Sequence, residues 1–269
     1  MNAFKTLPFV AVTAMLLTVA GCNNPGMASN RNSSNDSIPD KGFALLELYT
    51  SEGCSSCPPA DRLLARVQEE AGNRRIFLLC EHVDYWDDAH WKDAFSQHEF
   101  SQRQYRYDSR LKSQVYTPQL IINGTRECLG SDEAAVNAAV KNAVAKETKV
   151  NLDLKVRKQG NNIQISYSIN GNSPADKLLI AVVEKHAVRE IGDGENRGRT
   201  LNHAQIVRSL SSFSITGSKG IEQISLPVDY NAGNYEIVGF LQDERTNEIV
   251  SAVRAQIMVD AVISVSRQE

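Results

Sequence analysis

The sequence lacks two features that would point to familiar classes of protein. It has no run of basic residues, and its formal net charge is -3 over 269 residues. Because proteins that grip phosphates carry clustered lysine and arginine, no nucleic-acid partner is expected. No repeat of about 20 to 50 residues is visible, which argues against a repeat architecture. With 42% hydrophobic and 23% charged residues, the chain is long enough for one large domain or two ordinary ones.

Cysteine is also scarce, with five in the whole chain. A small scaffold held together by disulfides would have more of them in a shorter sequence. Only Cys54 and Cys57 are close together outside the N-terminal segment. The fold therefore has to rest on a hydrophobic core.

The N-terminal segment is the one long apolar run. Leu7 to Ala20 is almost uninterrupted, but it is too short to span a bilayer comfortably, so residues 1–21 are interpreted as a secretory signal peptide. Its end, Val19-Ala20-Gly21-Cys22, resembles the bacterial lipobox, which predicts lipidation of Cys22. Ordinary cleavage near Ala20 is the alternative.

The residues after the signal predict a membrane anchor and a tether. Asn23 follows the cysteine, and by resemblance to lipoprotein sorting in Gram-negative cells an asparagine there permits the outer membrane. Residues 22–40 are rich in Asn and Ser and have few large apolar side chains, so they are predicted to be flexible. The predicted location is the periplasm, with the protein anchored to a membrane.

Residues 41–148 are predicted to form an α/β domain. Short apolar runs suggest strands, amphipathic segments suggest helices, and Asn123-Gly124 is a hairpin signal. The expected order is β-α-β-α-β-β-α. Strands are expected at 43–50, 76–84, 115–123 and 127–129, and helices after the Cys57 turn up to Gly72, within 88–112 and at 134–145.

Residues 149–260 are predicted to form an all-β, immunoglobulin-like sandwich, followed by a tail at 261–269. Apolar and polar residues alternate in short runs separated by turn signals. Residues 190–205 are expected to be a long polar loop. The strands are expected near 150–156, 163–169, 178–184, 206–212, 221–228, 235–242 and 248–257.

The chemistry is expected at Cys54-Ser55-Ser56-Cys57, between a strand and a helix. A cysteine at a helix N-terminus is stabilised as a thiolate by the helix dipole and free backbone N–H groups. The thiolate is the nucleophile of disulfide exchange, and a second cysteine one turn on can resolve the mixed disulfide. A zinc site, completed by Cys80 with His82 or His90, is the weaker alternative because a strand would bury Cys80.

Thr117-Pro118 at the start of a strand strengthens the redox interpretation. A proline here, after a β-α-β-α order, matches the thioredoxin superfamily, in which this proline is cis and faces the cysteine pair. An edge-strand proline is the alternative. Four runs, LYTSEGCSSCPPADRLL, HVDYWDDAHWKDAF, VYTPQLIING and GENRGRTLNHAQIVR, together resemble a secreted bacterial family, domain-of-unknown-function family 1223, whose N-terminal domain is thioredoxin-like.

The thioredoxin resemblance implies roles for individual residues. Cys54 would attack, Cys57 would resolve and form the disulfide with Cys54, and Pro118 would be the cis-proline. One departure is Gly53, where thioredoxins usually have tryptophan, and it leaves a thioredoxin-like docking surface in question.

Several neighbours are candidate supporting residues. Glu47, in a strand covered on both faces, could be a buried carboxylate that shuttles the proton of the resolving thiol, or it could point to the edge of the sheet or pair with an arginine. Sites in open α/β sheets form at the carboxyl ends of strands. The expected substrate-binding residues at that end are Thr117, Asp84, Tyr85 and Trp86.

Two further groups remain open. Cys80 and Cys128 are expected to stay separate thiols, because their strands should lie on opposite edges of the sheet. A polar stretch of the β domain could dock onto the redox domain, bind a ligand or simply be solvated: Asn196, Arg197, Arg199, Thr200 and His203.

The leading hypothesis is a protein thiol–disulfide oxidoreductase that needs no cofactor. Its partners would be protein or peptide thiols and disulfides. The alternative is a binding module in which the cysteine pair is a static disulfide or holds copper or zinc.

Overall fold

The computed structural model describes residues 41–258. The expected signal peptide, the lipidation site Cys22, Asn23, the tether before residue 41 and the tail at 261–269 lie outside the described residues. Within the described range, no helix combines the length and the apolar character needed to cross a membrane.

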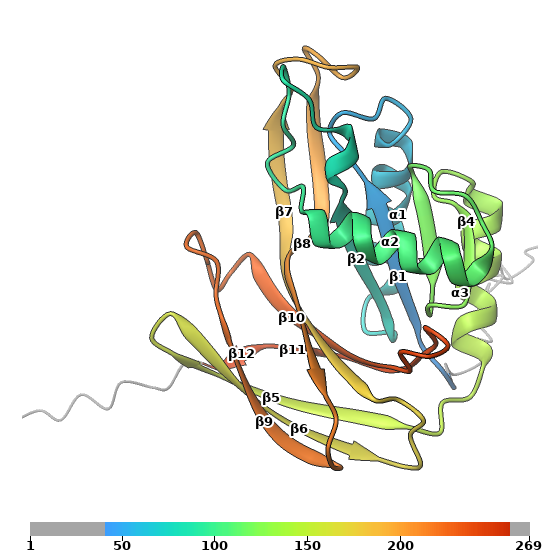
Figure 1. The fold of residues 1–269 in the computed structure, drawn as a ribbon, viewed down its shortest axis with the longest axis vertical. Helices are drawn as coiled ribbons and strands as arrows, with labels where there is room; N and C mark the ends of the chain where they lie inside the picture. The colour runs from blue at the N-terminus through green and yellow to red at the C-terminus, as the bar shows by residue number, and fades with distance from the viewer. Residues whose placement is uncertain (1–40, 259–269) are drawn as a thin grey trace, which may run out of the picture. The chain divides into compact units, whose positions relative to one another are not determined.

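The chain forms a mixed α/β structure with two sheets, mostly of strands (Figure 1). The larger sheet has eight strands in the order β11-β10-β7-β8-β2-β1-β3-β4, and the smaller has four in the order β12-β5-β6-β9. The N-terminal half contributes β1 (Ala44–Thr50), α1 (Pro58–Ala71), β2 (Ile76–His82), the 3-10 helix η1 (Asp84–Trp86), α2 (His98–Leu111), β3 (Gln119–Ile122), β4 (Arg126–Leu129) and α3 (Glu133–Ala145).

The first strand and helix form where local sequence predicts them. β1 is apolar except at Glu47 and Thr50 and is buried along its whole length. α1 has prolines in its first turn, where backbone N–H groups lack helical partners, and it ends at Gly72, whose φ is 54°. α1 and α3 pack on one face of the sheet, and α2 lies on the other (Figure 1).

The region predicted as one or two helices, 88–112, is helical only in α2. Trp91 and Phe95 lie in the preceding loop because they pack against the C-terminal half. A Cβ added at Gly192 would lie 3.1 Å from the Trp91 ring, and the Phe95 ring is 5.7 Å from that of His203. The positions of Trp91 and Phe95 therefore reflect packing between distant segments and not helical periodicity.

The C-terminal half is all β, as predicted, and its strands form two layers. Apolar residues that alternate along β5 and β6 pack against β7 and β10 in one core. The strands are β5 (Asn151–Gln159), β6 (Asn162–Asn170), β7 (Lys177–Glu190), β8 (Thr200–Ser214), β9 (Lys219–Ser225), β10 (Tyr235–Gln242), β11 (Ile249–Ala255) and β12 (Ile257–Met258).

β7 and β8 are longer than predicted and connect the two halves. They shorten the expected 190–205 loop to residues 191–199. β8 also pairs with β2, at Cys80 and Ile206, so strands of both halves share the eight-stranded sheet. This pairing brings the end of the β7–β8 hairpin beside the turn that contains Cys54 and Cys57.

Candidate functional site

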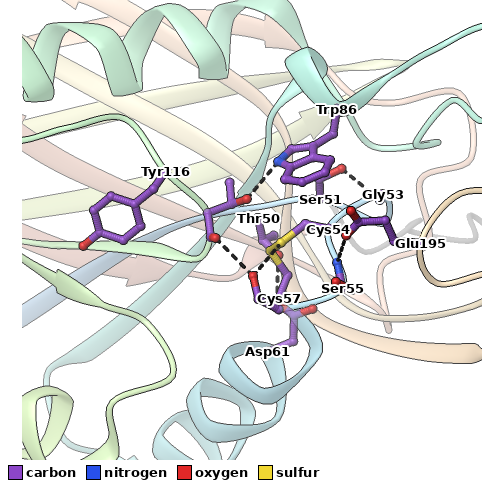
Figure 2. Close-up of a disulfide and its surroundings, with 12 residues drawn as sticks. Thr50, Ser51, Gly53, Cys54, Ser55, Cys57, Asp61, Trp86, Tyr116 and Glu195 are labelled. Atoms are coloured by element: carbon purple, nitrogen blue, oxygen red, sulfur yellow. Dashed lines mark hydrogen bonds between the residues drawn. A yellow bond between two sulfur atoms is a disulfide. The ribbon is translucent and has the colours of Figure 1, made fainter.

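The two neighbouring cysteines form a disulfide at the start of α1. Cys54 and Cys57 have Cα atoms 5.5 Å apart, and Cys57 is the N-cap residue of the helix. The backbone N–H of Cys57 donates to the carbonyl of Cys54. Both cysteines are 0% exposed, so the sulfur atoms are reached only when a neighbouring group moves (Figure 2).

Pro118 lies beside this turn, and its bond to Thr117 is cis. Ser56 provides the link, since its hydroxyl lies 3.2 Å from the Cys54 sulfur and donates to the Thr117 carbonyl at 3.3 Å. The Thr117 hydroxyl in turn accepts a 2.8 Å hydrogen bond from the indole N–H of Trp86. The structure thus brings together four residues that sequence predicted for the site, Cys54, Cys57, Thr117 and Trp86, with Pro118 next to them.

Trp86 also explains the glycine before the first cysteine. A Cβ added at Gly53 would lie 3.3 Å from the Trp86 Cβ and 3.3 Å from its carbonyl oxygen. Contacts this short leave little room for a side chain at position 53. The aromatic group next to the disulfide therefore comes from η1 and not from the residue before Cys54 (Figure 2).

The loop between β7 and β8 covers the disulfide turn from the other side. The Asn196 amide donates to the carbonyl oxygens of Glu52 at 2.8 Å and Cys54 at 2.9 Å, and Asn196 is fully buried. Glu195 accepts the backbone N–H of Ser55 at 2.9 Å. Because Asn196 bonds to Cys54 itself, the loop must loosen before that residue can move.

We expect Asn196→Ala to speed reduction of the disulfide by dithiothreitol about tenfold. The variant removes two buried hydrogen bonds, each worth about 1 kcal/mol, and so lowers the free energy of opening the loop. Asn202→Ala is the matched control, since Asn202 is exposed on β8. The rate is measured by alkylating released thiols in quenched samples. Equal rates for the two variants would show that the loop does not limit access.

Asp61 is a buried carboxyl that lies one helical turn after Cys57. It is 7% exposed, and its Oδ1 accepts a 3.1 Å hydrogen bond from the Thr50 hydroxyl. Residues four apart on a helix share a face, and Figure 2 shows Asp61 below Cys57. Burial raises the pKa of Asp61 to about 6, against the opposing effects of His82 and the Thr50 hydrogen bond. A carboxyl with this pKa can exchange a proton with a thiol near neutral pH.

The same shift makes stability depend on pH. Because the folded pKa of Asp61 lies above its ordinary value of 3.8, the folded state binds more protons between pH 4 and 6, and stability falls as pH rises through that window. We expect Asp61→Asn to remove this loss. The free energy of unfolding of the variant, relative to that of wild type, should therefore rise by about 3 kcal/mol from pH 4 to pH 7. Urea unfolding at both pH values measures the difference. Glu70→Gln, exposed on the same helix, is the control, and a constant offset for Asp61→Asn would contradict the assignment.

A buried ion pair of His82 and Asp93 lies near Asp61. His82 Nδ1 is 2.7 Å from Asp93 Oδ2, and that oxygen also accepts the backbone N–H of Glu52. Burial alone would lower the pKa of His82 and raise that of Asp93, but their mutual attraction outweighs it and reverses both shifts. Among the described residues, no group of three or more His, Cys, Asp or Glu side chains is arranged to hold a metal ion.

The expected position of Glu47 beside the thiols is wrong. Glu47 Oε1 accepts the Arg103 Nε–H at 2.6 Å, and its Oε2 accepts the Tyr107 hydroxyl at 2.6 Å. Side chains alternate along β1, so Leu46 and Leu48 face α1 while Glu47 faces α2. The arginine pairing that sequence left open is the one observed.

Asp84 and Tyr85 also face α2. The Asp84 carboxylate accepts the Ser101 hydroxyl and pairs with His98, and the Tyr85 hydroxyl donates to Gln104 at 3.0 Å. The Tyr85 ring is 39% exposed. Of the expected substrate-binding residues, Trp86 and Thr117 are therefore the two with contacts next to the disulfide.

Cys80 and Cys128 are separate thiols, as predicted, although for a partly different reason. β1 and β3 lie between their strands, but β2 is interior because β8 covers its other side. Burial raises the pKa of Cys80 well above its ordinary value and that of Cys128 to about 11. Both thiols stay protonated at neutral pH and are poor nucleophiles.

Sequence analysis missed Asp61, Glu52 and Asp93 as neighbours of the site. The position of Asp61, four residues after Cys57 on a helix, was a usable signal. Glu52 and Asp93 carry no such signal, since the hydrogen bond between them spans 41 residues and the bond of Glu52 to Arg189 spans 137.

A known protein family matches most of the chain. The family described as "Protein of unknown function (DUF1223)" matches residues 45–242, which include the disulfide, the cis-proline and most of the C-terminal half. The chain belongs to the DUF1223 family. The resemblance inferred from the four sequence runs is confirmed at this level. No curated protein matches.

One solved structure is similar over most of the chain. This DUF1223 chain is similar to a protein from Agrobacterium tumefaciens solved by structural genomics, with 25% identity, a TM-score of 0.63 and coverage of 79% of this chain and 94% of that one. A domain of the outer membrane lipoprotein Omp28 from Porphyromonas gingivalis matches at 16% identity, with a TM-score of 0.28, over 42% of this chain and 92% of its own.

Proposed function

We propose that this protein is an exported thiol–disulfide oxidoreductase whose N-terminal half is thioredoxin-like and whose C-terminal strands form an immunoglobulin-like sandwich. The observation that carries the proposal is the disulfide of Cys54 and Cys57 at the N-terminus of a helix. That position favours a thiolate when the bond opens, since the dipole and the free N–H groups of a helix start stabilise negative charge.

Cys54, Cys57 and Asp61 each have a role in the proposed reaction. A thiolate of a substrate dithiol attacks the Cys54 sulfur, the Cys54–Cys57 bond breaks, and Cys57 leaves with the electron pair. Asp61 supplies the proton that converts Cys57 to a thiol. The second thiolate of the substrate then attacks the substrate sulfur that is bonded to Cys54. This step forms the substrate disulfide and releases Cys54 as a thiolate, so two electrons pass from the substrate to the protein.

Groups around Cys54 support its role as the attacked and attacking sulfur. The Ser56 hydroxyl, 3.2 Å away, can donate to a thiolate at Cys54 when its hydrogen turns from the Thr117 carbonyl to the sulfur. Ser55 and Ser56 are exposed, so a substrate reaches the turn from this side once Cys54 is uncovered. Trp86 and Thr117 form the wall of the proposed substrate site.

Titration in glutathione buffers tests the proposal. The full chain is equilibrated at a series of glutathione ratios, and free thiols are trapped by alkylation. A single reversible two-electron transition that involves Cys54 and Cys57 is expected. The burial of both sulfurs favours the second candidate, a static structural disulfide in a binding protein. A pair that remains oxidised even in excess dithiothreitol would support that candidate and reject the oxidoreductase.

The proposed location and partners follow from the residues before position 41. Export, lipidation at Cys22 and anchoring to a membrane stay predictions from the lipobox-like end of the apolar run. An exported protein would meet oxidising conditions in which protein and peptide disulfides occur. Such thiols and disulfides are therefore the proposed substrates.

A further inference from the structure

His203, a residue of β8, lies between two buried carboxyls next to the disulfide. Its Nδ1 is 3.8 Å from Asp61 Oδ2, and its Nε2 is 3.7 Å from Glu52 Oε1. His203 is 2% exposed, and neither ring nitrogen has a hydrogen-bond partner among the described residues. A buried imidazole with both nitrogens aimed at carboxylates needs an explanation, because unpaired buried polar groups are costly.

Burial, more than the surrounding charges, keeps His203 neutral. The facing groups are Glu52, Asp61, Asp93, His82, His186 and Arg189. Burial and, after it, the charge of His82, whose ring centroid is 5.0 Å away, together lower the pKa of His203 to about 3, although Asp93 opposes the fall. A neutral imidazole has one N–H and one free nitrogen, so it can accept a proton on one side and give one up on the other.

The two carboxyls are suited to such an exchange. Burial raises the pKa of Glu52 as it does that of Asp61, although Arg189 opposes the rise. Arg189 contacts Glu52 at 3.1 Å, and its side chain is 36% exposed, so this end of the row approaches solvent. Each gap to His203 is about 0.7 Å longer than a hydrogen bond, and rotation of the ring changes both.

We propose that His203 relays the proton from Glu52 to Asp61 when the Cys54–Cys57 disulfide opens. Asp61 gives its proton to the Cys57 sulfur, His203 Nδ1–H reprotonates Asp61, and His203 Nε2 takes the proton of Glu52, which recovers one from water. The electrons come from the substrate dithiol. His203 is thus a positioning residue that acts through Asp61, and the C-terminal half takes part in the reaction. The inference rests on the proposed oxidoreductase function.

His203→Gln tests the relay, because a glutamine amide can bond to both carboxyls but cannot pass a proton between them. The full-length oxidised protein is reduced with dithiothreitol, and the reduced protein is reoxidised with oxidised dithiothreitol, in H₂O and in D₂O. We expect both rates to fall about tenfold in His203→Gln, less than the roughly 10²- to 10⁴-fold of direct general acid–base catalysis, because His203 acts through Asp61. Their ratio should stay unchanged, and the solvent isotope effect of wild type should disappear. His90→Gln, at an exposed loop position, is the control.

Further variants separate the possible outcomes. Asp61→Asn should slow reduction and reoxidation as much as His203→Gln does. The double variant Asp61→Asn/His203→Gln should be no slower than either single variant, since the two residues act in one path. His203→Phe serves if His203→Gln does not fold. Wild-type rates for His203→Gln, or a change in the equilibrium ratio instead of the rates, would overturn the relay alone. A wild-type disulfide that dithiothreitol does not reduce would overturn the proposed function, and the relay with it.

Discussion

Arg103→Leu is expected to destabilise the folded protein by about 4 kcal/mol, the usual cost of removing one partner of a buried ion pair. Arg103 is 4% exposed and bonds to Glu47 at 2.6 Å, to Tyr107 at 2.8 Å and to Gln242 at 3.1 Å. Its Nε also lies 3.7 Å from a Glu81 oxygen. The variant leaves the Glu47 carboxylate buried without a counter-charge.

Glu81 increases the cost of that loss. Burial, followed by repulsion from Glu47, raises the pKa of Glu81 well above its ordinary value, while Arg103 opposes the rise. Without the arginine, Glu81 would ionise even less readily, and the buried Glu47 would face it with no counter-charge. The effect should therefore be larger at pH 8 than at pH 5, where protonation is cheaper.

Urea unfolding measures the change, with Arg106→Leu, exposed on the same helix, as the control. Glu47→Gln in the Arg103→Leu background should recover part of the loss, because it removes the charge that Arg103 balanced. A difference of under about 1 kcal/mol between Arg103→Leu and its control would mean that the pair adds nothing to stability, as for exposed pairs.

The elements that sequence predicted well are those specified by nearby residues. The apolar run of β1, the prolines and glycine that bound α1, and the Asn123-Gly124 hairpin all depend on contacts within a few residues. The cysteine pair at a helix start follows from the same local signals. Because propensity, hydrophobic period and turn chemistry agree in these segments, the sequence is informative there.

The parts that sequence did not predict depend on pairing between distant segments. Nothing local to Cys80 or Ile206 indicates that their strands are neighbours, and this pairing is what brings His203 to Asp61. Likewise Glu47 is 56 residues from Arg103, so the sequence alone did not decide which group Glu47 contacts. Pairing between distant strands decides which groups each polar residue of this site contacts. The chemical properties of each residue, by contrast, follow from its residue type alone.

Exchange by the wild-type protein is expected to disappear in Cys54→Ser, with a loss of more than about 10³-fold, the scale seen when an enzyme loses its nucleophile. Cys57→Ser should instead form a stable mixed disulfide, because Cys54 attacks a substrate disulfide, displaces one half of it as a thiolate and keeps the other half, with no second sulfur left to release it. Mass spectrometry of the chain after incubation with oxidised glutathione distinguishes the two: one glutathione bound to Cys57→Ser and none to Cys54→Ser.

The two other cysteines in the described part of the chain provide the internal control for this result. Cys80 is 4% exposed, and the raised pKa values of Cys80 and Cys128 keep both protonated, so Cys80→Ser and Cys128→Ser should exchange at wild-type rates. Glutathione on Cys54→Ser would show that Cys57 attacks as readily as Cys54. That outcome would assign no preference to the sulfur next to Ser56, and the order of attack and resolution proposed here would have to be reversed or abandoned.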